Sequence, residues 1–113
     1  MIVDDDSRFR RTLHLGLVSH GYEVSDAADG KEALDALANI APDLIVLDWQ
    51  MPEMDGIQTC RILRLSSDVP VIMVSGNRSN SKEVALAAGA TSYLAKPFSM
   101  NDLLTLFESA LKS

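Results

Sequence analysis

The chain contains the apolar runs Leu44-Ile45-Val46-Leu47 and Val71-Ile72-Met73-Val74. Neither run alternates apolar with polar residues, as a strand with one solvated face would. Unbroken apolar runs of this length are typical of strands that are covered on both faces, and such strands occur in parallel sheets. The two runs therefore predict a parallel sheet that lies between two layers of helices.

Three further short apolar runs extend the same pattern along the chain. They lie at Ile2–Val3, Tyr22–Val24 and Tyr93–Ala95, so that the five runs begin 20 to 27 residues apart. This spacing matches the length of one strand with the helix that follows it. Apolar residues at helical spacing follow each run. The expected helices cover about residues 7–20, 31–40, 56–65 and 80–89, and a last helix begins at residue 99.

The ends of three helices carry their own signals. Gly21 can take the left-handed conformation that ends the first helix. Asn80 with Glu83, and Ser99 with Asp102, have the spacing of capping boxes at the start of the last two helices. Strict alternation of strands and helices, joined by right-handed crossovers, predicts a doubly wound α/β sandwich.

Size and composition indicate one folded unit. The chain has 113 residues and a mass of 12.3 kDa, and 47% of its residues are apolar. This is the usual size of a single compact domain with its own core, so we expect one domain over residues 1–113. No apolar run approaches the roughly 18 residues that a membrane span needs, and the first residues do not resemble a secretory signal.

The charge balance and the cysteine count narrow the function classes. A net charge of −6 would repel phosphate backbones and anionic lipids, so we expect no direct binding to nucleic acids or membranes. Cys60 is the single cysteine, which excludes an internal disulfide and favours the cytoplasm. Five arginines are first interpreted as residues of solvated helix faces: Arg8, Arg10, Arg11, Arg61 and Arg64.

Polar and charged side chains follow four of the five predicted strands. They are Asp4, Asp5 and Asp6 after the first, Asp48 after the third, Ser75 after the fourth and Lys96 after the fifth. In an open α/β sheet the ligand site lies beyond the carboxyl ends of the strands. We therefore expect carboxylates, a hydroxyl and an ammonium to converge at one edge of the sheet.

This set of groups predicts a magnesium site beside a phosphorylated species. Carboxylates that are brought together repel one another unless a cation compensates them. The candidate ligands are all oxygens, which favours Mg²⁺ over zinc. Lys96 could bind one oxygen of an added phosphoryl group through its charge, and Ser75 could donate a hydrogen bond to another.

Taken together, these residues resemble the receiver domains of bacterial two-component response regulators, the CheY-like family. The matching segments are Val3-Asp4-Asp5-Asp6, Leu47-Asp48-Trp49-Gln50-Met51-Pro52-Glu53-Met54-Asp55-Gly56, Val74-Ser75-Gly76, Gly89-Ala90 and Lys96-Pro97-Phe98. The resemblance covers essentially the whole chain. It implies a flavodoxin-like (βα)5 sandwich whose five-stranded parallel sheet has the order 2-1-3-4-5.

The resemblance also implies a role for each site residue. Asp48 would accept a phosphoryl group, and Mg²⁺ would be the cofactor. The implied metal ligands are Asp5, Asp48, the backbone carbonyl of Gln50 and, through a water, Asp4. The implied phosphoryl-binding residues are Ser75, Lys96 and Gly76, with Lys96–Pro97 as a cis peptide. Ser75 and Tyr93 would form the switch, and Trp49 would lie at the rim of the site.

The same resemblance implies a signalling switch rather than an enzyme in the usual sense, with only Mg²⁺-dependent self-phosphorylation and self-dephosphorylation. The donor would be a phosphohistidine on a sensor histidine kinase or a phosphotransfer protein. Residues 80–112 would present the output face to an effector domain, a partner protein or a second copy of the chain. The polar segment 77–81 is expected to be the most mobile part.

Three other function classes remain as alternatives. A receiver-like module could bind partners without phosphorylation, although such modules usually lack an acidic residue or the lysine. A hydrolase with an aspartyl nucleophile would need a second acid two residues after Asp48, where this chain has Gln50. A nucleotide-binding module would carry a glycine-rich phosphate loop, and neither common form of that loop occurs in the sequence.

Overall fold

A computed structural model describes residues 1–76 and 80–112 of the chain. The strands are β1 (Ile2–Val3), β2 (Asp26–Ala27), β3 (Ile45–Asp48), β4 (Val71–Gly76) and β5 (Ser92–Lys96). The helices are α1 (Ser7–Ser19), α2 (Gly30–Ala36), α3 (Gly56–Leu63), α4 (Ser81–Ala87) and α5 (Met100–Leu111). Residues 77–79, which belong to the segment expected to be mobile, lie outside the described residues.

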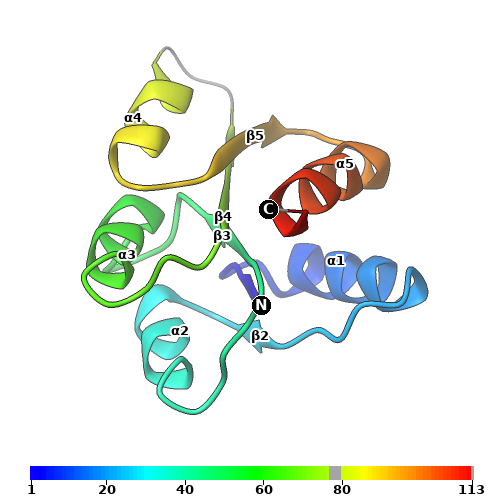
Figure 1. Cartoon of the computed structure of the whole chain (residues 1–113), viewed down its shortest axis with the longest axis horizontal. Coiled ribbons are helices and arrows are strands. Elements are labelled where there is room, and N and C mark those ends of the chain that lie inside the picture. Colours follow the sequence, from blue (N-terminus) through cyan, green and yellow to red (C-terminus); the bar gives the residue numbers. More distant parts are fainter. Residues whose placement is uncertain (77–79, 113) are drawn as a thin grey trace.

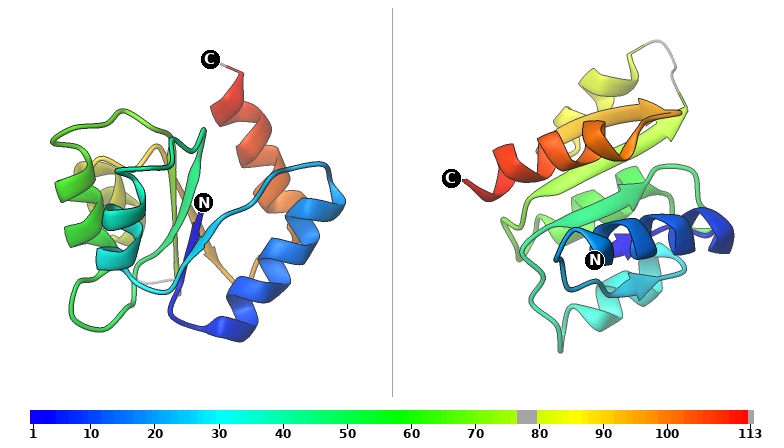
Figure 2. Two further views of the ribbon diagram at one scale, coloured as in Figure 1. Left: turned by 90° about the horizontal axis from the view of Figure 1, so that it is seen from below. Right: turned by 90° about the vertical axis from the view of Figure 1, so that its right-hand side faces the viewer.

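All strand pairs in the sheet are parallel, and the order is β2-β1-β3-β4-β5. Helices α1 and α5 cover one face, while α2, α3 and α4 cover the other (Figure 1). Seen from below, the sheet lies between the two helix layers (Figure 2). The predicted doubly wound sandwich and its strand order are therefore confirmed.

The core consists of two clusters that the sheet separates. Val71, Ile72 and Met73 of β4 are fully buried, and alternate residues of that strand face opposite clusters. Phe107 of α5 belongs to one cluster, and Cys60 of α3 belongs to the other. Burial of β4 on both faces explains why its sequence shows no alternation.

The second strand lies later in the chain than its apolar pattern predicts. The run Tyr22–Val24 is not a strand, and β2 instead comprises Asp26 and Ala27, which pair with the two residues of β1. Tyr22 and Val24 pack against the cluster beneath α1 and α5, and the Tyr22 ring meets Phe107 edge-on at 5.1 Å. Packing against helices, not strand pairing, accounts for the apolar residues of this run.

Helix ends agree with the sequence in part. Gly21 has φ of +91°, and Ser99 and Asp102 form the expected capping box. Asn80 does not cap α4 with its side chain, because it takes a left-handed conformation with φ of 66°. Helices α2 and α3 end at Ala36 and Leu63, earlier than the patterns predict.

Among the residues that the structure describes, no helix combines the length and apolarity needed to span a membrane.

Candidate functional site

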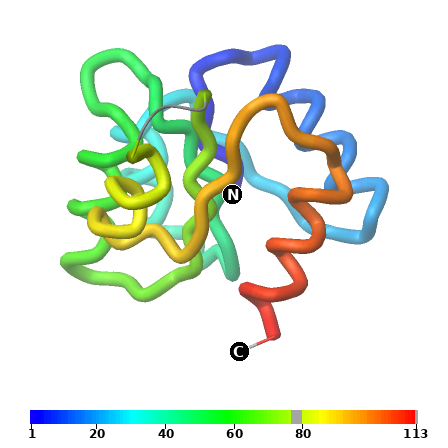
Figure 3. Tube along the Cα trace, turned by 90° about the horizontal axis from the view of Figure 1, so that it is seen from above, coloured from blue at the N-terminus to red at the C-terminus, as the bar shows by residue number. Residues whose placement is uncertain are grey.

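The carboxyl ends of the strands bring the predicted polar residues to one edge of the sheet. Asp4 follows β1 directly, Asp48 ends β3, and Lys96 ends β5. Ser75 is the penultimate residue of β4. The segments that follow β1, β3 and β5 lie along the same edge of the molecule (Figure 3, upper edge). Parallel pairing is what gives strands that are distant in sequence a common edge.

Three carboxylates form the centre of this edge. One side-chain oxygen from each of Asp4, Asp5 and Asp48 lies within 4.8 Å of the others. Asp4 and Asp48 are buried, whereas Asp5 is exposed. Negative charges at this spacing, with two of them out of contact with water, make a site that strongly favours a cation.

The pKa values of the two buried carboxyls show the cost of this arrangement. Burial, followed by the negative charge of Asp4, raises the pKa of Asp48 to about 6. Burial also raises the pKa of Asp4, although the backbone N–H of Asp6 and the charge of Lys96 oppose the shift. With a pKa of about 6, the Asp48 carboxyl is partly protonated in mildly acidic solution, and a bound cation would hold it ionised.

Lys96 supplies the positive charge nearest to the buried carboxylates. Its Nζ lies 3.2 Å from Oδ1 of Asp48 and 3.6 Å from Oδ2 of Asp4. The same Nζ lies 4.3 Å from the centroid of the Phe9 ring. One ammonium cannot neutralise three carboxylates, so the site retains excess negative charge.

The first turn of α1 holds Asp4 in place. Asp6 is the N-cap of α1, and its side chain accepts hydrogen bonds from the backbone N–H groups of Arg8 and Phe9. The backbone N–H of Asp6 donates to Oδ1 of Asp4 at 2.8 Å. Nη1 of Arg10 donates to the backbone carbonyl of Asp4 at 2.6 Å. Arg10 is thus half-buried at the site and does not belong to a solvated face.

Ser75, Gly76 and Tyr93 lie on the two neighbouring strands β4 and β5. The buried Ser75 donates a hydrogen bond from Oγ to the carbonyl of Gly76 at 3.1 Å. The Tyr93 hydroxyl also donates to that carbonyl, at 3.2 Å. A hydroxyl from each strand therefore meets one carbonyl at the end of β4. A methyl group on Gly76 would meet no described atom within 4 Å.

The loop after β3 is held close to the acidic cluster. The backbone N–H of Trp49 donates to the carbonyl of Val74, and that of Gly56 donates to the carbonyl of Trp49. A Cβ on Gly56 would lie 2.4 Å from the backbone oxygen of Asp48, so only glycine allows α3 to begin there. Gln50 is exposed in this loop, and Trp49 is partly buried. The Lys96–Pro97 peptide bond is cis.

The donor set suits Mg²⁺. Asp4, Asp5 and Asp48 offer hard carboxylate oxygens at mutual distances that allow one ion to contact them or their bound waters. The raised pKa values of Asp4 and Asp48 are the response expected of carboxyls that lack such a charge. The acidic cluster is therefore typical of a metal site.

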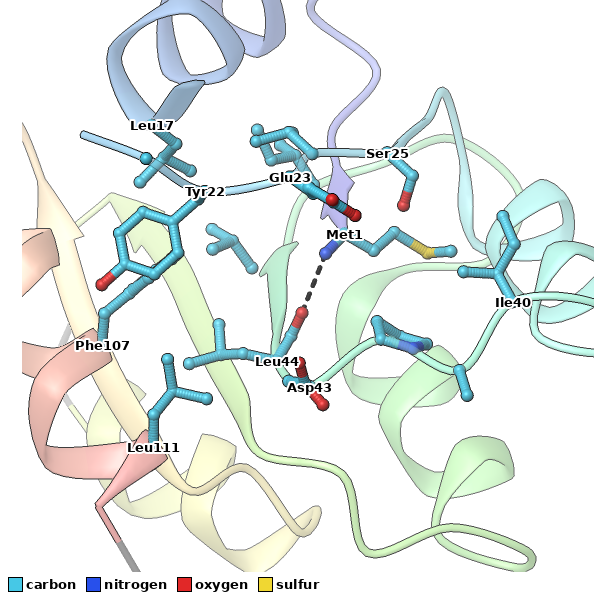
Figure 4. Close-up of a pocket in the computed structure, with 16 residues that line it drawn as sticks. Met1, Leu17, Tyr22, Glu23, Ser25, Ile40, Asp43, Leu44, Phe107 and Leu111 are labelled. Carbon is cyan, nitrogen blue, oxygen red and sulfur yellow. Dashed lines mark hydrogen bonds between the residues drawn. The ribbon is translucent and has the colours of Figure 1, made fainter. Parts of the chain in front are cut away.

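Figure 4 shows a separate pocket of about 500 Å³ at the opposite end of the strands. Its lining is mostly apolar and includes Leu17, Ile40 and Phe107. The Met1 amino group lies there and donates to the carbonyl of Leu44 at 2.8 Å. None of the three clustered carboxylates lines this pocket, so it is distinct from the candidate site.

Comparisons with known proteins show which family this chain resembles. The sequence profile of the response regulator receiver domain matches residues 1–108. The response regulator MprA of Mycobacterium tuberculosis (strain ATCC 25177 / H37Ra) is 43% identical over 114 residues, which cover 99% of this chain and 50% of that protein. MprA of Mycobacterium sp. (strain KMS) is 44% identical with the same coverage. The chain spans about half the length of these curated relatives.

Solved structures show the same similarity. The receiver domain of the Francisella response regulator 1452 superposes with a TM-score of 0.93 at 34% identity, over 98% of this chain and 93% of that one. The Vibrio cholerae chemotaxis protein CheY4 superposes with a TM-score of 0.91 at 35% identity, over 97% and 95% of the two chains.

Proposed function

We propose that this chain, which belongs to the response regulator receiver family, takes the phosphoryl group on Asp48. Membership of that family makes the chain a phosphoacceptor of two-component signalling. The observation that carries this proposal is the place of Asp48 at the end of β3. There it contacts Lys96 and lies within 4.8 Å of Asp4 and Asp5. A carboxylate that lies beside both an ammonium and a cation site can act as a nucleophile toward phosphorus.

The proposed phosphoryl transfer needs few protein groups. The phosphorus–nitrogen bond of a phosphohistidine breaks while a phosphorus–oxygen bond to Asp48 forms, and the imidazole takes up a proton as it leaves. Attack by water on the same phosphorus later returns the carboxylate and releases inorganic phosphate. Transfer of this kind depends on positioning and on charge stabilisation more than on a general base. The chain is accordingly a switch rather than a catalytic enzyme.

In this proposal Asp5, Asp48 and the backbone carbonyl of Gln50 hold Mg²⁺, and Asp4 holds it through a water. The bound ion would neutralise charge on the transferring phosphoryl oxygens. The carboxylate cluster and its oxygen-only donors support this assignment. Burial and anchoring of Asp4 by Asp6 support an orienting role for that carboxylate.

Lys96 and Ser75, with the open space at Gly76, are the proposed binding groups for the phosphoryl oxygens. Lys96 already lies 3.2 Å from Asp48. Ser75 would have to exchange its bond to the Gly76 carbonyl for one to a phosphoryl oxygen. Tyr93 donates to that same carbonyl, so a change at Ser75 reaches β5 through a shared acceptor. This coupling is the basis for proposing Ser75 and Tyr93 as the switch.

The proposed output face comprises residues 80–112, which include α4, β5 and α5. Val84 and Leu86 of α4 are about 40% exposed, and Leu111 of α5 is similarly exposed. Apolar side chains of this kind favour contact with an effector domain, a partner protein or a second copy of the chain.

The proposed phosphoryl donor is a sensor histidine kinase or a phosphotransfer protein. We place the chain, as a single receiver domain over residues 1–113, in the cytoplasm.

Trp49 fluorescence tests the proposed function. Trp49 follows Asp48 directly, so its emission should change when Mg²⁺ is added and again when beryllofluoride, a mimic of an acyl phosphate, is added. Asp48→Asn should abolish the second change. Asp6→Asn is the matched control, because asparagine also caps helices and Asp6 lies outside the acidic cluster. A folded protein that responds to neither addition would favour a phosphate-independent binding module.

A further inference from the structure

The ring of Phe9 lies against the Lys96 ammonium, which also contacts two carboxylates. Nζ of Lys96 lies 4.3 Å from the Phe9 ring centroid and also contacts Asp48 and Asp4. Phe9 lies on α1, whereas Lys96 ends β5. We propose that Phe9 is a positioning residue that holds the Lys96 ammonium in place for the phosphoryl group through a cation–π contact. The proposal rests on the function proposed above.

A lysine needs such support because its side chain is long. Fixing its rotatable bonds has an entropy cost, and an ammonium exposed to water is strongly hydrated. In this structure 29% of the Lys96 side chain remains exposed, so most of it is shielded from water. The negative face of an aromatic ring attracts a cation, and the attraction increases as water is removed. Phe9 can therefore fix the ammonium without neutralising its charge.

Phe9 is itself held from two directions. Its backbone N–H donates to Oδ1 of Asp6, the N-cap of α1, at 3.2 Å. Its ring meets Phe98 edge-on, with centroids 5.8 Å apart and an interplanar angle of 89°. Phe98 lies two residues after Lys96, so this aromatic pair joins α1 to the segment that carries the lysine. A ring fixed in this way can limit where the ammonium lies.

A carboxylate alone could not hold the Lys96 ammonium in one place both before and after phosphorylation. The Asp48 contact must change when that carboxylate becomes an acyl phosphate, whereas the Phe9 ring takes no part in the chemistry. The ring can thus support the ammonium both before and after phosphorylation. An ammonium that is already fixed loses less freedom when it binds a phosphoryl oxygen, and the complex gains affinity.

The test compares beryllofluoride affinity at saturating Mg²⁺, followed by Trp49 fluorescence, among variants of residue 9. Phe9→Leu and Phe9→Met should weaken the affinity about three- to tenfold, since partly desolvated cation–π contacts are of that strength. Phe9→Tyr should bind like the wild type because it keeps the ring. Magnesium affinity should change less than twofold in all three variants. Phe107→Leu is the matched control, because that aromatic ring belongs to the core cluster against which Phe9 packs but meets Tyr22 edge-on.

A spectroscopic readout separates positioning from a general loss of packing. The chain has four lysines, and only Lys96 lies over a ring among the described residues. Its ε-methylene protons should resonate upfield of the other lysines in the wild type and in Phe9→Tyr. The shift should disappear in Phe9→Leu and persist in Phe107→Leu.

Three outcomes would overturn the inference while leaving the proposed function intact. The first is beryllofluoride affinity that is unchanged or tighter in both Phe9→Leu and Phe9→Met. The second is a loss of affinity in Phe9→Tyr that equals the loss in Phe9→Leu. The third is the absence of the upfield lysine signal from the wild type. Failure of the wild type itself to bind beryllofluoride with Mg²⁺ would instead overturn the proposed function, and the inference with it.

Discussion

Nζ of Lys96 lies 3.2 Å from Oδ1 of Asp48, although the two residues come from strands β5 and β3, which β4 separates. The lysine therefore reaches across the end of β4, where Ser75 and Gly76 lie. Nζ also approaches Asp4 at 3.6 Å, so one ammonium faces two buried carboxylates. The two contacts of Nζ link the ends of β5, β3 and β1 at the point where we propose that the phosphoryl group binds.

The raised pKa of Asp48 predicts how stability depends on pH in the metal-free protein. Its pKa of about 6 in the folded protein lies above the ordinary value of 3.8, so the folded state binds the proton more tightly than the unfolded state. Ionised Asp48 therefore lowers stability, and its unfavourable contribution grows as pH rises from about 4 to about 6.

Asp48→Asn should remove that contribution. At pH 7 without metal, we expect the variant to unfold with a free energy about 1–2 kcal/mol higher than the wild type. The loss of the Lys96 contact offsets part of the gain. Urea unfolding from pH 4 to pH 7.5 measures the difference, which should shrink toward zero at the acidic end. A difference that grows as pH falls would contradict the sign of the shift.

Magnesium affinity should decrease below about pH 6. Protons and the metal compete for the Asp48 carboxylate, whose pKa is about 6 before the metal binds. Calorimetric or fluorescence titrations at several pH values should show about tenfold weaker binding for each pH unit well below that value. Asp6→Asn should show the same profile as the wild type. Affinity that stays constant from pH 7 to pH 5 would show that Asp48 is not a ligand.

Lys96→Ala should separate metal binding from phosphoryl binding. The lysine contacts Asp48 and Asp4 as a cation, so its removal leaves the carboxylates more negative and should preserve or tighten Mg²⁺ binding. Beryllofluoride binding should weaken by at least tenfold, because the ammonium is the proposed partner of a phosphoryl oxygen. Loss of magnesium affinity in this variant would indicate a structural role for Lys96 instead.

Arg64→Met should destabilise the fold by about 2–3 kcal/mol in urea unfolding. The Arg64 guanidinium donates to the carbonyl oxygen of Gly89, in the turn before β5, at 2.8 Å. It also donates to the carbonyl oxygens of Ser67 and Val69, in the loop between α3 and β4, at 3.2 and 2.7 Å. Arg61→Met is the matched control on the same helix and should change stability by less than about 0.5 kcal/mol, since Arg61 is exposed. Equal effects of the two substitutions would show that the three bonds contribute little.

The strands with the clearest signal in the sequence are β3 and β4, whose residues are almost all buried. Val71, Ile72 and Met73 are inaccessible to solvent because helices cover both faces, and this leaves an unbroken apolar run in the sequence. Strand β2 gives no such signal, because it has two residues, of which Asp26 is exposed. The apolar residues before β2 are explained by side-chain packing, such as that of Tyr22 against Phe107.

The residues of the candidate site also divide into those that the sequence predicts and those that it does not. Residues at strand ends were predictable, because parallel strands share a carboxyl edge and Asp4, Asp48 and Lys96 each follow an apolar run. Phe9 and Arg10 were missed, because they lie on a helix. Their contacts with Lys96 and Asp4 depend on how α1 is rotated against the sheet. Outside the site, the expected solvated position of Arg64 is wrong, because its half-buried guanidinium donates to carbonyl oxygens in two loops.

Phosphoryl labelling tests the central claim most directly. The wild type, Asp48→Asn and Asp6→Asn would each be incubated with acetyl phosphate and Mg²⁺, and intact-protein mass spectrometry would count the phosphoryl groups added. We predict one group on the wild type and on Asp6→Asn, none on Asp48→Asn, and none on any protein when a chelator removes Mg²⁺. Labelling of Asp48→Asn at the wild-type rate would contradict the account, because the acceptor would then be another residue.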